Sequence, residues 1–134
     1  MDNLILVSHG NFCTELKNSA EMIMGTQDSI YTVPLLAEEG ESEFLAKFEK
    51  IAQSLDNFIV FSDLLGGTPC NILSKKLMNG ESFELYAGMS LPMVISYVNA
   101  NLVGTESDFV AEAKESTIKV NELLASDVFD EEDE

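Results

Sequence analysis

The sequence predicts an α/β fold with a doubly wound, mainly parallel sheet of strand order 2-1-3-4. Short apolar runs rich in β-forming residues alternate with longer segments whose apolar residues recur at helical spacing. The runs are apolar at every position, which is typical of strands buried on both faces of a sheet. Strands that alternate with helices form right-handed crossovers between parallel neighbours. We expect one domain over residues 1–124 and an acidic tail over 125–134.

The first half of the chain contains two expected strands, each followed by an expected helix. The strands cover 4–7 and 30–33, and the second is expected to stop at Pro34. The first helix ends at Gly25, because glycine is favoured just past a helix end. The second helix follows an acidic loop and carries apolar residues from Phe44 to Leu55.

The second half continues the alternation. Strands are expected over 58–61 and 83–87, and the helix between them has Thr68 at its N-cap and Pro69 at its first helical position. Further helices are expected over 91–101 and near 108–114. A last strand is expected around Thr117–Val120.

The charge balance excludes several partners. The chain has 24 acidic residues against seven lysines and no arginine, for a net charge of −17 over 134 residues. Nucleic-acid binding depends on Lys and Arg at phosphates, and an anionic membrane surface attracts basic segments, so neither is expected as a partner. A basic protein partner would be attracted by the long-range field.

Two further observations indicate the cellular compartment of the protein. No segment reaches the roughly 20 apolar residues that span a bilayer, and the start of the chain lacks the features of a signal peptide. The two cysteines are far apart in sequence, as in a reduced protein. We therefore expect a cytoplasmic protein without direct membrane insertion.

His9 and Asp63 are the candidate catalytic pair. In a doubly wound sheet the ligand site lies beyond the carboxyl ends of the strands where the winding reverses, here between the first and third strands. His9, the one histidine of the chain, follows the first strand, and Asp63 follows the third. A carboxylate bonded to Nδ1–H fixes the tautomer, leaves Nε2 as the nucleophile and stabilises charge that develops on the ring.

The turn after the third strand completes a candidate site for a phosphoryl group. The first-turn N–H groups of the following helix and its dipole favour an anion. Gly66 and Gly67 leave room for phosphate to approach the backbone, while Ser8 and Thr68 offer hydroxyl donors. Nucleotide-binding glycine motifs are missing, so nucleotide binding is not indicated. We expect no cofactor and no metal.

At this point the residues resemble a known family. The segments 4–10 (LILVSHG), 63–71 (DLLGGTPCN) and 88–93 (GMSLPM) resemble the EIIA component of the mannose/fructose/sorbose family of the bacterial sugar phosphotransferase system (PTS). The match runs in order through nearly the whole chain. One departure is Ser90, which stands where the family often has asparagine.

The resemblance implies an activity and partners. A family member accepts a phosphoryl group from phospho-HPr on the histidine that matches His9, partnered by the aspartate that matches Asp63, and passes it to the EIIB component. EIIB then phosphorylates a sugar carried by membrane permease subunits. Members are typically homodimers that exchange a C-terminal edge strand, here the segment around Thr117–Val120. The sugar cannot be named from this chain.

Other functions remain open from the residues alone. The phosphocarrier of dihydroxyacetone kinase systems shares the fold, although the G-G-T-P turn looks more like the sugar-transport branch. A flavodoxin-like module for a small ligand would have the same switch point. A receiver-type switch lacks its acidic pair after the first strand, and a thiol hydrolase with Cys70 and His9 is the weakest alternative.

Overall fold

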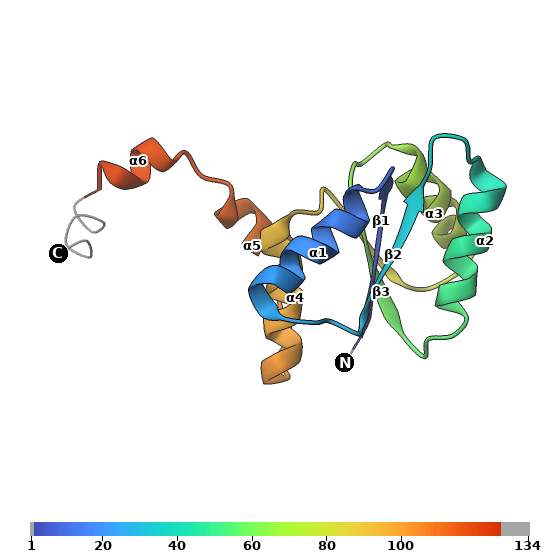
Figure 1. Ribbon diagram of the computed structural model, residues 1–134, viewed down its shortest axis with the longest axis horizontal. Helices are drawn as coiled ribbons and strands as arrows, with labels where there is room; N and C mark the ends of the chain where they lie inside the picture. The colour runs from blue at the N-terminus through green and yellow to red at the C-terminus, as the bar shows by residue number, and fades with distance from the viewer. Residues whose placement is uncertain (1, 127–134) are drawn as a thin grey trace.

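The computed structural model describes residues 2–126, which form a four-stranded parallel sheet with helices on both faces (Figure 1). The sheet and its connections alternate as expected through α4, and two short helices follow. The elements are β1 (Asn3–His9), α1 (Phe12–Met24), β2 (Ile30–Leu35), α2 (Glu41–Ala52), β3 (Phe58–Ser62), α3 (Thr68–Met78), β4 (Glu84–Ala87), α4 (Leu91–Val103), α5 (Phe109–Ser116) and α6 (Val120–Leu124).

The strand order β2-β1-β3-β4 confirms the predicted topology. All three neighbouring pairs are parallel, and β1 lies between β2 and β3, with Val7 level with Val33 on one side and with Ser62 on the other. The chain leaves β1 toward β2 and later returns to β1's other side as β3. The carboxyl ends of β1 and β3 therefore meet where the winding reverses.

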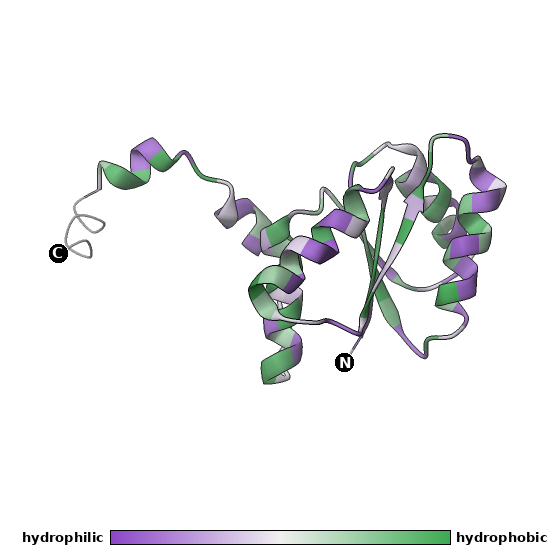
Figure 2. Ribbon diagram, viewed as in Figure 1, coloured by the Kyte–Doolittle hydropathy of each residue, from purple (hydrophilic) through white to green (hydrophobic). Residues whose placement is uncertain are grey.

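The core has two layers, one on each face of the sheet, because successive side chains of β1 point to opposite faces. Leu4 and Leu6 pack with residues of α1, α4 and α5. Ile5 and Val7 pack with residues of α2 and α3. All four are fully buried, and each contributes about 1.5–3 kcal/mol by leaving water. The central strands are accordingly hydrophobic along much of their length, whereas the helices are mixed (Figure 2).

Two boundary predictions were wrong by small margins. β2 continues through Pro34 to Leu35, because an edge strand tolerates a proline that donates no hydrogen bond to a further neighbour. Gly67, not Thr68, is the N-cap of α3, so the helix begins one residue earlier than expected, and Pro69 still lies in its first turn. Ser90 caps α4, where its Oγ accepts from the Met93 N–H (3.4 Å).

The predicted strand around Thr117–Val120 was wrong. Residues 117–119 have no regular structure, and Val120 begins α6. This segment extends away from the sheet (Figure 1), so no neighbouring strand is present to pair with its backbone groups. The acidic stretch 127–134 lies outside the described residues. Within residues 2–126, no helix has the length and apolar character needed to cross a bilayer.

Candidate functional site

The fold brings the two predicted catalytic residues together at the carboxyl end of the sheet. His9 is the last residue of β1, and Asp63 directly follows β3, the adjacent strand. Neighbouring strands are about 4.8 Å apart, so side chains at these two ends are within hydrogen-bonding reach. The pair is 54 residues apart in sequence and in direct contact in space.

One carboxylate oxygen holds both the ring and the backbone of His9. Asp63 Oδ2 lies 2.8 Å from His9 Nδ1 and accepts a hydrogen bond from the His9 backbone N–H at 3.0 Å. Because an ionised carboxylate only accepts hydrogen bonds, the proton of the neutral imidazole belongs on Nδ1. The lone pair is then on Nε2. The His9 side chain is 50% exposed and that of Asp63 only 12%, so the ring is accessible to another molecule and the carboxylate is shielded.

The second oxygen of Asp63 is buried and has no hydrogen-bond partner among the described residues. Both hydrogen bonds of this carboxylate therefore come from His9. A buried carboxylate with few donors stabilises positive charge on its neighbour more strongly than a well-solvated one does. This arrangement suits an imidazole that gains positive charge as Nε2 attacks an electrophile.

The turn after Asp63 is held by its own hydrogen bonds. The Gly67 N–H donates to the Leu64 carbonyl (3.1 Å), and the Asn71 side-chain amide donates to the Gly66 carbonyl (3.1 Å). Gly66 is exposed, whereas Gly67 is buried beside the His9 imidazole. Sequence analysis singled out both glycines, and the structure brings Gly67 into the immediate surroundings of the ring.

The N-terminus of α3 begins at this turn. The N–H groups of Thr68 and Cys70 donate to no acceptor within residues 2–126, as expected for the first turn of a helix. The Thr68 side chain is exposed one residue beyond Gly67, which itself lies against the ring. An anion bound to Nε2 would find free backbone donors and the positive end of the helix dipole nearby.

Ser8 was predicted to contact the phosphoryl group, and its hydroxyl is hydrogen-bonded within the protein. Its side chain is fully buried, and its hydroxyl donates to the Gly10 carbonyl (3.0 Å) and accepts from the Cys13 N–H (2.8 Å). Asn11, the N-cap of α1, makes no side-chain cap hydrogen bond, so Ser8 satisfies that helix end instead. The geometry favours a role for Ser8 in holding the loop after His9 over direct contact with a ligand.

Three large apolar side chains are exposed and lie close to His9 or Asp63 in the sequence. Phe12 is 49% exposed, Leu64 58% and Leu65 80%. Phe12 opens α1 three residues after His9, and the two leucines follow Asp63 directly. We call these three residues the apolar rim. Sequence analysis missed it, although apolar residues inside two predicted loops were a visible indication.

The cysteines do not form part of an exposed site. Cys13 and Cys70 are both buried and both free thiols. Burial raises the pKa of the Cys13 thiol. Buried thiols near helix N-termini behave as small packed side chains, which weakens the thiol hydrolase alternative.

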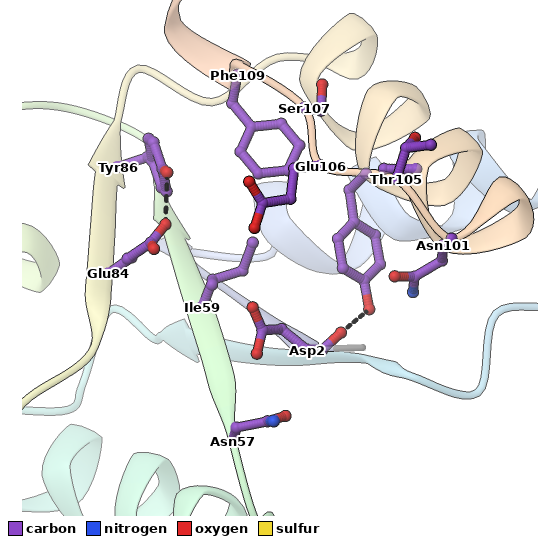
Figure 3. A pocket seen from close by; sticks show the side chains of 13 residues that line it. Asp2, Asn57, Ile59, Glu84, Tyr86, Asn101, Thr105, Glu106, Ser107 and Phe109 are labelled. Carbon is purple, nitrogen blue, oxygen red and sulfur yellow. Dashed lines mark hydrogen bonds between the residues drawn. The ribbon is translucent and has the colours of Figure 1, made fainter.

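A cavity of about 520 Å³ lies at the opposite end of the sheet (Figure 3). Carboxylates of Asp2, Glu84 and Glu106 and the rings of Tyr86 and Phe109 line it. The Tyr86 hydroxyl donates to Glu84 Oε1 (2.6 Å). Burial, reinforced by this carboxylate, raises the pKa of Tyr86 to about 12. None of the six predicted site residues lines this cavity.

Sequence comparisons find similar proteins. Residues 3–114 match the family EIIA-man, described as "PTS system fructose IIA component". The fructose-specific EIIA component of Bacillus subtilis is 26% identical over 102 residues, covering 74% of this chain and 70% of that protein. The mannose-specific EIIAB component of Escherichia coli is 25% identical over 100 residues, 72% of this chain but 31% of that longer protein.

Solved structures also resemble this chain. The PTS IIA protein associated with the fucose utilization operon of Streptococcus pneumoniae superposes with a TM-score of 0.79 at 26% sequence identity. The superposition covers 92% of this chain and 96% of that one.

Proposed function

The chain belongs to the EIIA-man family, and from that membership and the site geometry we propose that it carries a phosphoryl group on His9 between two proteins of a sugar phosphotransferase system. The chain is a phosphotransferase component of a sugar PTS. The proposal adds that phospho-HPr is the donor, that Nε2 of His9 is the accepting atom and that the EIIB component is the acceptor. The main support for this proposal is the contact of 2.8 Å between His9 Nδ1 and Asp63 Oδ2.

The transfer step follows from this contact. The Nε2 lone pair forms a bond to phosphorus while the bond from phosphorus to the donor's atom breaks and its electron pair leaves with the donor. The Nδ1 proton stays in its hydrogen bond to Asp63, whose charge balances the positive charge on the ring. Transfer to EIIB repeats the step in the opposite direction, with Nε2 as the leaving atom.

The phosphoryl group would rest at the N-terminus of α3. We propose that the N–H groups of Thr68 and Cys70 and the Thr68 hydroxyl donate to its oxygens, while Gly66 keeps the turn open. The chain has no arginine that could bind the phosphoryl group during its transfer. The partner proteins therefore supply the cations, and the charge of −17 attracts basic partners.

The acceptor and its downstream partners come from the family. EIIB passes the group to a sugar carried by membrane permease subunits, so this chain meets the membrane only indirectly. The E. coli relative is named as an EIIAB component, and this chain spans 31% of it. We propose the EIIB component as the acceptor and a cytoplasmic location, in keeping with two free cysteines.

We also propose that the chain forms a homodimer through its C-terminal segment. Residues 117–126 extend away from the sheet (Figure 1) and expose the apolar side chains of Ile118, Val120, Leu123 and Leu124. Exposed apolar side chains on an extended segment favour contact with a second chain. Light scattering of the full chain and of a chain ending at residue 116 tests this, since only the former should be dimeric.

The decisive experiment measures the mass of the intact protein after incubation with phosphoenolpyruvate, Enzyme I and HPr. We expect one phosphoryl adduct that is labile in acid and stable in alkali, as phosphohistidine is. His9→Ala, which has no other histidine to replace it, should carry no adduct. An adduct that persists in His9→Ala would refute the proposal.

A further inference from the structure

Two adjacent glycines lie in the turn between β3 and α3, and different constraints act on them. Gly66 has a φ of +83°, which glycine adopts without strain, and a Cβ added there would meet nothing within 4 Å. Gly67 has φ −78° and ψ 161°, a conformation open to any residue. Backbone conformation therefore explains why position 66 is glycine, but it does not explain why position 67 is.

The lack of room for a side chain explains why position 67 is glycine. A Cβ added to it would lie 2.7 Å from Cε1 and 3.5 Å from Nε2 of His9. The first distance is far below the ~3.5–4.0 Å at which carbon atoms are in favourable contact. The same Cβ would lie 3.2 Å from the Leu64 carbonyl oxygen, which belongs to the turn itself.

The turn is less free to move than the ring. The Gly67 N–H donates to the Leu64 carbonyl (3.1 Å), and the Gly67 carbonyl accepts from the Asn71 N–H (2.9 Å). His9 is half exposed, and its ring is the far end of a side chain with two rotatable bonds. An added side chain at position 67 would therefore move the imidazole and leave the backbone in place.

We propose that Gly67 is a positioning residue for phosphoryl transfer, because its bare Cα forms the surface against which the Cε1–Nε2 edge of the His9 imidazole lies. Asp63 holds the ring at Nδ1, and Gly67 limits the other edge. The effect on transfer rests on the proposed function, whereas the ring position is a property of the unphosphorylated protein. A side chain at position 67 would push the ring aside. Nδ1 would then move away from Asp63, and Nε2 would no longer point at the phosphorus atom of the donor.

Gly67→Ala tests this proposal, with Gly40→Ala as the matched control. Gly40 is also a helix N-cap with negative φ (−111°), at the start of α2, and a Cβ added there meets only Glu43 Oε1, at 3.4 Å. Both substitutions change an N-cap glycine to alanine, and only one meets His9. The measurements are the phosphorylation rate by phospho-HPr, the Tm, and the ¹⁵N spectrum of the single histidine ring.

Gly67→Ala should lower the phosphorylation rate by about 10-fold or more, since a misplacement near 1 Å is enough for such losses. Its Tm should change no more than that of Gly40→Ala, and its His9 ring resonances should shift before any phosphorylation. Gly67→Val should shift them further. Gly40→Ala should leave both the rate and the ring spectrum as in the wild type.

Three results would overturn the proposal. One is a wild-type rate and ring spectrum in Gly67→Ala. Another is a lower rate with an unchanged ring spectrum, which would indicate that Gly67 contacts the phosphoryl group instead. The third is a fall in Tm that accounts for the fall in rate. If the wild type itself is not phosphorylated, the proposed function fails, and the ring spectrum alone decides the role of Gly67.

Discussion

At the carboxyl end of the sheet His9 is half exposed among short loops, whereas at the amino end a cavity of about 520 Å³ is lined by carboxylates and aromatic rings. The two ends share the same four strands. Enzymes that act on small molecules usually place their reactive groups in the cavity. The proposed reactive pair lies outside it, which fits the proposal that both substrates are proteins whose own surfaces reach the nucleophile.

The two ends also differ in how their polar groups are satisfied. At the carboxyl end, Asp63 receives two hydrogen bonds from His9, and its other oxygen is buried without a partner among residues 2–126. Around the cavity, the Tyr86 hydroxyl donates to Glu84, and the rings of Phe61, Tyr86 and Phe109 meet edge to face along the sheet. The polar groups in the two places are thus satisfied differently, by His9 for Asp63 and by each other for Tyr86 and Glu84.

The largest effect is expected from Asp63→Ala, which removes the acceptor for both the ring and the backbone N–H of His9. The phosphorylation rate should fall by roughly 10²–10³-fold, within the range for loss of a group that orients and charges a catalytic histidine. Single-turnover phosphorylation by phospho-HPr measures it.

Asp63→Asn distinguishes the effect of the negative charge of Asp63 from its effect on the orientation of the His9 ring. Its amide oxygen can still accept both hydrogen bonds, so the ring should stay oriented while the negative charge is lost. We expect a rate between those of Asp63→Ala and the wild type. A wild-type rate in both variants would mean that Asp63 is only a turn residue and that the two ends do not differ as described.

Phe109→Ala tests the surroundings of the cavity. Phe109 is 8% exposed and packs against the rings of Phe61 and Tyr86, so it joins α5 to the sheet. Its loss should lower the free energy of unfolding by about 3 kcal/mol, the lower end of the range for a buried aromatic residue. Urea denaturation measures this loss. The phosphorylation rate of the folded variant should remain at the wild-type value, and a parallel loss of rate would contradict a division between the two ends.

The fold and the pairing at the carboxyl end were predictable from the sequence, whereas the cavity was not. The strand order, the switch point and the pairing of His9 with Asp63 follow from apolar runs and the residues just after them, because those patterns are local. The space that Gly67 leaves for the imidazole is a contact between residues 58 positions apart, and no local pattern contains it. The buried position of Ser8 was missed because a hydroxyl beside a nucleophile reads equally well as a ligand contact or as a helix cap.

The C-terminal strand was mispredicted for a related reason. Thr117, Ile118 and Val120 have high β-propensity, and that propensity reflects how well side chains fit a pleated, half-buried surface. In the single chain these residues are exposed and have no strand beside them. Propensity without a pairing partner does not produce a strand.

Leu65→Ser tests whether the apolar rim contributes to docking at the carboxyl end. Leu65 is 80% exposed, so its replacement should leave the free energy of unfolding within about 0.5 kcal/mol. The KM for phospho-HPr should rise about 10-fold with little change in kcat, as expected for one apolar contact at an interface. Met22→Ser is the control, because Met22 is 88% exposed on the last turn of α1. Equal KM values in the two variants would remove the rim from the docking surface.

The smallest effect concerns Tyr86, whose pKa is raised to about 12 by burial and then by the hydrogen bond to Glu84. The folded chain keeps the phenol proton at pH values where the unfolded chain, with a pKa near 10, has lost it. The unfolded state therefore binds fewer protons, and stability should fall as the pH rises from about 10 to about 12. Urea denaturation across this range should show a shallower fall for Tyr86→Phe than for the wild type.

Glu84→Gln sharpens the same test, because it keeps a hydrogen-bond acceptor and removes the charge. The pKa of Tyr86 should move downward but stay above its ordinary value, since burial is the larger cause. Phenolate absorbance, with Tyr86→Phe to assign the transition, follows the shift. Phosphorylation of His9 at neutral pH should be unchanged in both variants, because the carboxylates around the cavity lie at the other end of the sheet from Nε2. A changed rate would mean that the two ends communicate.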